Sequence, residues 1–116
     1  MKVKRITGSQ GSWDVRVTYT DGTTEVMPTA HKEFWKGDRY ERGGPDDVTW
    51  KHYSSRPRFQ KHVELLHQTK RVAVTFDHFD HAAGIWHRDG YSGVFDIDDI
   101  KVDDHGMSFR FVRRVQ

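Results

Sequence analysis

The sequence contains no cysteine, so it can form neither disulfide bonds nor thiolate metal sites. It is also poor in apolar residues, which make up 34% of the 116 residues and form no run long enough to cross a membrane. The polar first segment, MKVKRITGSQ, lacks the apolar stretch of a secretory signal. We therefore expect a cytoplasmic protein that has no membrane partner.

Aromatic residues offset this shortage of aliphatic side chains. Seven Phe, four Tyr and four Trp account for 13% of the chain. Each of these rings buries a large apolar area, and disordered chains contain few of them. The composition predicts a single α+β domain over residues 1–116.

Alternating apolar and polar residues predict strands in the first part of the chain. In WDVRVTYT, residues 13–20, every second residue is apolar, which is the period of a half-buried strand. Asp21-Gly22 then predicts a tight turn into a second strand, TTEVMP, in a register that places Val17 opposite Val26 on the core face.

The last third of the chain predicts a second group of strands. RVAVTF, GIWHRDGYSGVFDI and MSFRFVRRV all have strand periodicity, with a second turn expected at Asp89-Gly90 that would place Trp86 opposite Gly93. The apolar positions change parity after Asp98-Asp99, which predicts a β-bulge there.

Between these two groups, the segment RPRFQKHVELLHQT predicts the principal helix, over about residues 56–69. Pro57 suits its first turn, and Phe59, Val63 and Leu66 form an apolar stripe. The preceding VTWKHY, residues 48–53, predicts a short strand. The expected fold is a mainly antiparallel β-sheet that curls toward a small open barrel, with two β-meanders and the principal helix between them.

The segment DHFDHAAGIWH, residues 77–87, concentrates imidazoles and carboxylates. If His78, His81 and His87 converged, they could bind a divalent metal ion or act as general acid and base, which would indicate an enzyme. The spacing matches no metal-binding motif, however, and the same residues suit a polar connection of roughly eight residues between strands. We favour the connection, and therefore expect no metal, no catalytic residue and no cofactor.

A basic and aromatic segment indicates a different function. Four Lys or Arg and no Asp or Glu lie in residues 48–63, in a chain whose formal net charge is only +2. Cationic side chains attract phosphates, and exposed rings stack on bases. The residues predicted to bind DNA or RNA lie in this segment and on the last strand: Lys51, Tyr53, Arg56, Arg58, Lys61, Arg110, Arg113 and Arg114.

A module that binds a small ligand or another protein is the alternative. Aromatic side chains often line such pockets in small twisted sheets, and the candidates are Trp35, Tyr40, Trp50 and Trp86. A homodimer also stays open, because pairing would cover an exposed edge strand. The leading hypothesis is a small, non-enzymatic binding protein with nucleic acid as its partner.

Overall fold

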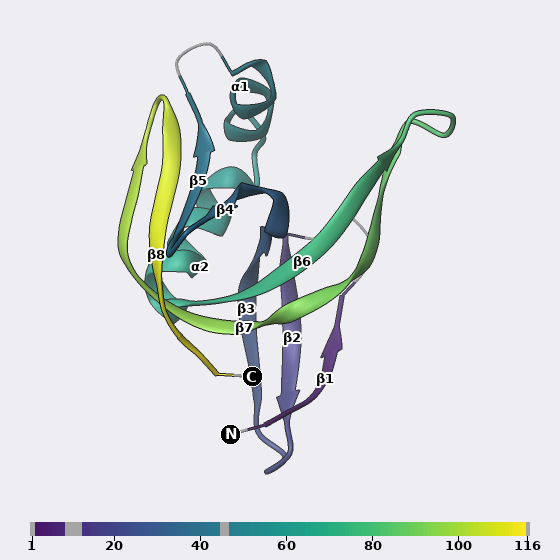
Figure 1. Ribbon diagram of the computed structural model, residues 1–116, viewed down its shortest axis with the longest axis vertical. Coiled ribbons are helices and arrows are strands. Elements are labelled where there is room, and N and C mark those ends of the chain that lie inside the picture. Colours follow the sequence, from purple (N-terminus) through teal and green to yellow (C-terminus); the bar gives the residue numbers. More distant parts are fainter. Residues whose placement is uncertain (1, 9–12, 45–46, 116) are drawn as a thin grey trace.

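The computed structural model describes residues 2–8, 13–44 and 47–115 (Figure 1). Within them, eight strands form a sheet with the order β1-β2-β3-β6-β7-β8-β5-β4. The strands are β1 (Val3–Thr7), β2 (Asp14–Tyr19), β3 (Thr24–His31), β4 (Trp35–Lys36), β5 (Arg39–Gly43), β6 (Arg71–Asp80), β7 (Ile85–Asp103) and β8 (Gly106–Arg114). The helices are a single 3₁₀ turn (Lys32–Phe34), α1 (Val48–Ser54) and α2 (Phe59–Thr69).

The expected α+β architecture and its two meanders are present. Strands β1-β2-β3 form one antiparallel meander, and β6-β7-β8 form the other. The meanders meet where β3 and β6 pair in parallel, from Thr29 opposite Ala73 to His31 opposite Thr75, so the sheet is mixed.

The small open barrel does not form across the described residues, although the sheet is strongly curved (Figure 1). Closure would need the outer edge of β8 to return to β1. That edge is instead occupied by β5, which pairs with β8 over Arg39–Gly43. The sheet therefore keeps two separate ends, at β1 and β4.

The prediction of a strand over residues 48–53 is wrong, because this segment forms α1. The Asp47 carboxylate accepts a hydrogen bond from the Trp50 backbone N–H at 3.0 Å, which caps the helix N-terminus. Trp50 and Tyr53 lie three residues apart on one helix face and are both buried. The predicted principal helix is present as α2, but it begins at Phe59 rather than near residue 56.

The β2–β3 hairpin has a register one residue away from the predicted one. Val17 lies opposite Glu25 rather than Val26, because the Tyr19 N–H bonds to the Thr23 carbonyl and lengthens the connection. A slip of one residue exchanges the two faces of a strand. Met27 therefore enters the core, and Val26 is exposed.

The predicted turn at Asp89-Gly90 is also wrong. Both residues lie inside β7, which runs without interruption from Ile85 to Asp103. As a result Trp86 pairs with Phe79, and Gly93 pairs with Val74. The bulge at Asp98-Asp99 is confirmed, since the register shifts there and Asp99 has a φ of 51°.

Helices α1 and α2 pack against one face of the curved sheet (Figure 1). The core on that side centres on Trp50, Leu66 and Phe109, and the Trp50 indole N–H donates to the Asp104 carbonyl at 3.1 Å. A second core includes Val17 and Met27. No helix in the described part of the chain is long and apolar enough to cross a membrane.

A chain of polar side chains crosses five strands where the two meanders join. The Tyr19 hydroxyl donates to Glu25 at 2.8 Å, and Arg71 binds Glu25 at 3.1 Å and Asp96 at 2.7 Å. Arg113 binds the other oxygen of Asp96 at 2.8 Å. Arg71 is the central member, because it joins β6 to both β3 and β7 and its side chain is only 19% exposed.

We expect Arg71→Leu to lower the free energy of unfolding by about 2–3 kcal/mol, because it leaves two partly buried carboxylates without their shared cation. Urea denaturation followed by circular dichroism measures this change. Arg110→Leu is the matched control. It breaks an ion pair with Asp98 whose partners are both about half exposed, so its cost stays below about 1 kcal/mol. Equal losses in the two variants would contradict the central place of Arg71.

Candidate functional sites

The basic segment, residues 48–63, spans α1, the connection to α2 and the first turns of α2. Its four cationic side chains, those of Lys51, Arg56, Arg58 and Lys61, are exposed. Within the described ranges, no carboxylate lies within ion-pair distance of any of them. The segment therefore presents charge that the fold itself does not neutralise.

Aromatic packing positions part of this segment. The Tyr53 ring stacks on Trp13 with 4.5 Å between centroids, and the Arg58 guanidinium lies over the Trp13 ring at 5.2 Å. Cation–π contact of this kind limits the freedom of the guanidinium. The Tyr53 ring is only 9% exposed, so it is not free to stack on a base as the sequence suggested.

The three arginines of β8 differ from those of the basic segment. Arg110 makes two hydrogen bonds to Asp98, at 2.8 and 2.6 Å, and Arg113 binds Asp96. The hydrogen bond from Arg110 lowers the pKa of the Asp98 carboxyl below its usual range. Arg114 donates to the Ser92 carbonyl and lies over the Phe95 ring. The charges of Arg110 and Arg113 are thus neutralised within the sheet.

The histidine-rich segment is part of a β-hairpin rather than a connection of roughly eight residues. Strand β6 continues to Asp80 and β7 starts at Ile85, and together they form an arm that extends from the sheet (Figure 1). The exposed apolar side chains Phe79 and Trp86 are cross-strand partners on this arm.

The arm does not bring the three histidines together. The imidazoles of His78 and His87 stack with 5.2 Å between centroids, whereas that of His81 packs against the edge of Phe79. His78 is bound to Asp89 at 2.8 Å, and His87 to Asp80 at 3.2 Å. Among the described residues, no group of three His, Asp or Glu side chains is placed to hold a metal ion.

Of the four aromatic residues expected to line a ligand pocket, three belong to or pack against one core cluster and the fourth lies on the arm. Tyr40 and Trp50 are buried in the core, and Trp35 stacks on Phe111 with 3.9 Å between centroids. Trp86 lies on the arm and is 45% exposed. The described residues therefore do not combine these four rings into one pocket.

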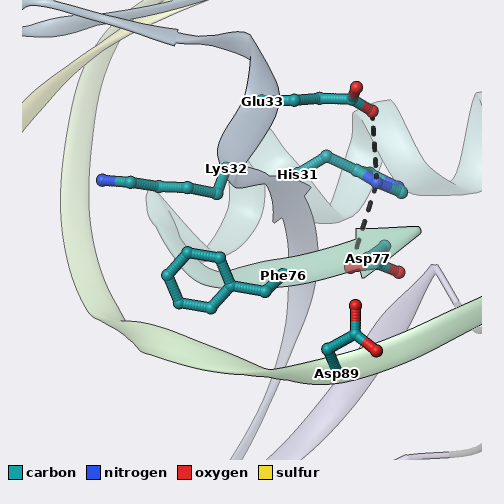
Figure 2. Close-up of a pocket in the computed structure, with 6 residues that line it drawn as sticks. All are labelled: His31, Lys32, Glu33, Phe76, Asp77 and Asp89. Atoms are coloured by element: carbon teal, nitrogen blue, oxygen red, sulfur yellow. Dashed lines mark ion pairs between the residues drawn. The ribbon is translucent and has the colours of Figure 1, made fainter.

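A hollow that the sequence did not indicate lies where β3 leads into the 3₁₀ turn beside β6 and β7. Its volume is about 310 Å³, and Figure 2 shows the side chains that line it. The residues lining it are His31, Lys32, Glu33, Phe76, Asp77 and Asp89. His31 is isolated in the sequence, and only the parallel pairing of β3 with β6 brings it beside Asp77.

Asp77 is the most buried charged group in the hollow, with a side chain that is 2% exposed. One carboxylate oxygen, Oδ2, lies 3.5 Å from Nε of Arg88. The other, Oδ1, has no hydrogen-bond partner in the described part of the chain and lies 4.0 Å from Nδ1 of His31. That distance is too long for a hydrogen bond.

Burial is the main cause that lowers the pKa of His31 to about 4. The charge of Asp77 opposes this shift, and those of Arg42 and Arg88 add to it. Burial likewise lowers the pKa of His62, on α2, to about 4. Both imidazoles are therefore neutral at pH 7.

Comparisons with protein-family models, with curated proteins and with solved structures found no match.

We expect stability to decline as the pH falls from 6.5 toward 4. An unfolded histidine binds a proton below about pH 6.5, but His31 and His62 resist protonation in the folded state until about pH 4. Each contributes a slope of up to about 1.4 kcal/mol per pH unit. Urea denaturation at steps of half a pH unit measures the decline, and His62→Gln removes about half of it. A flat profile between pH 6.5 and 4.5 would contradict this assignment.

Proposed function

We propose that the protein binds nucleic acid through the phosphate backbone, with the basic segment as the interface. The observation that carries this proposal is that Lys51, Arg56, Arg58 and Lys61 are exposed and not paired with carboxylates within the described ranges. When exposed, unneutralised cations bind phosphates, the counterions condensed on the nucleic acid are released, and that release drives binding.

The geometry favours an interface with fewer residues than the sequence predicted, because it leaves out the arginines of β8 that pair with carboxylates. Arg110 and Arg113 would have to give up their ion pairs with Asp98 and Asp96 before they could meet a phosphate. Arg58, by contrast, is already held at the surface by the Trp13 ring. Because the Tyr53 ring is buried, contacts with phosphates outweigh contacts with bases. The proposed activity is therefore independent of base sequence and strongly dependent on salt.

We expect binding to a fluorescent single-stranded 20-mer of mixed sequence, DNA or RNA, to weaken about 50-fold between 50 and 200 mM salt. Four neutralised phosphates give a slope of log K against log salt of about −3. Fluorescence anisotropy measures both the affinity and the slope. The variant that combines Lys51→Ala, Arg56→Ala, Arg58→Ala and Lys61→Ala should abolish binding at 200 mM salt.

The matched control removes four exposed cations from β7 and β8 instead. It combines Lys101→Ala, Arg110→Ala, Arg113→Ala and Arg114→Ala, so its net charge equals that of the first variant. Circular dichroism verifies that both variants fold. The proposal fails if the wild-type protein does not bind at 50 mM salt, or if the control loses as much affinity as the first variant.

A further inference from the structure

The hollow beside His31 owes its shape to a bulge in β7. Phe76 pairs with Gly90, and Asp77 pairs with Arg88, so Asp89 is an extra residue between two consecutive pairs. A bulge of this kind redirects the side chains around it, and bulges are frequent near functional sites. Here Phe76, Asp77 and Asp89 all line the hollow (Figure 2).

Two buried polar atoms, on residues that line the hollow, lie close together without a hydrogen-bond partner in the described part of the chain. They are Oδ1 of Asp77 and Nδ1 of His31, which lie 4.0 Å apart. A small side-chain movement that admits a nitrogen atom about 2.9 Å from each would satisfy both, because a carboxylate accepts hydrogen bonds and so does Nδ1 of an imidazole that carries its proton on Nε2. Such a ligand must donate at least two hydrogens from one atom.

The carboxylates around these two atoms outnumber the cations. Asp77, Glu33 and Asp89 line the hollow, and Oε1 of Glu33 lies 4.0 Å from Nδ1 of His31. The charges of Arg88, beside Asp77, and of Arg42 oppose them in part, and His78 is bound to Asp89. Lys32 contributes little positive charge to the hollow, because its ammonium lies 3.8 Å from the centroid of the Trp35 ring and points away from His31 (Figure 2). An ammonium group fits both this charge and the need for several donors.

The wall of the hollow supplies an apolar surface. Phe76 lines it and is 44% exposed. A ring at this position covers the hydrocarbon part of a ligand, and its face attracts a cation.

We propose that this hollow is a binding site for a primary ammonium ion carried on a small apolar group, with Asp77 and His31 as its hydrogen-bond acceptors. Glu33 and Asp89 add negative charge, and Phe76 covers the apolar group. The hollow shares no residue with the basic segment, so this proposal does not depend on whether the protein binds nucleic acid.

Titration with benzylammonium chloride, followed through the imidazole nitrogen resonances of His31 by NMR, tests this proposal. We expect saturable binding with a dissociation constant on the order of 1 mM. Two related probes separate the contributions. Benzyl alcohol lacks the charge, and benzyltrimethylammonium lacks the N–H donors, so each should bind at least about tenfold more weakly.

Asp77→Asn should weaken benzylammonium binding at least about tenfold, because it removes the buried charge. If this variant does not fold, the double variant Glu33→Gln and Asp89→Asn, at two exposed positions, should weaken binding about threefold to fivefold. Glu64→Gln, on the exposed side of α2, is the matched control and should leave binding unchanged.

Three results would overturn the proposal. One is the absence of saturable shifts up to about 20 mM benzylammonium, which would mean that the hollow holds water only. Another is equal binding of benzyl alcohol. The third is unchanged affinity in folded Asp77→Asn or, where that variant does not fold, in the double variant.

Discussion

The ion pair of Arg71 with Glu25 joins the two meanders, and the ion pair of Arg71 with Asp96 fixes the same guanidinium within the second meander. The backbone junction between the meanders is short, because β3 and β6 pair only from Thr29 opposite Ala73 to His31 opposite Thr75. Arg71 adds a side-chain contact between β3 and β6 before the first backbone pair, Thr29 with Ala73. The hollow lies beside the last pair, His31 with Thr75. The geometry of the hollow therefore depends on the same alignment that Arg71 secures.

Local patterns predicted the elements that depend on local forces. The alternation in residues 13–20 and the parity change at Asp98-Asp99 both appear in the structure as expected. The errors arose where tertiary packing overrides a local signal. Asp89-Gly90 is a strong turn dipeptide, yet it lies inside β7, where continued pairing with β6 satisfies more backbone groups than a turn would. In residues 48–53 the spacing of Trp50 and Tyr53, with Asp47 as a cap, was the signal for a helix.

The candidate sites, too, could be predicted only where they depend on residues that are close in the sequence. The basic segment was recognisable because its four cations lie within eleven residues with no Asp or Glu between them, and they remain exposed in the structure. Carboxylate partners such as Asp98, which pairs with Arg110, could not be assigned from the sequence, since cross-strand register decides them. The hollow was not recognisable at all, because His31 and Asp77 belong to different meanders and meet only through the parallel junction.

The connectivity of the sheet also sets the order in which it can assemble. The hairpins β2–β3 and β6–β7 join neighbouring segments, which form within microseconds. The pairing of Tyr40 with Phe109 joins β5 to β8 from distant parts of the chain and must close a large loop that contains both helices. Such non-local pairings slow folding, since the entropy of loop closure is lost before the contacts form. The strand pair that prevents barrel closure is thus expected to be among the last to form.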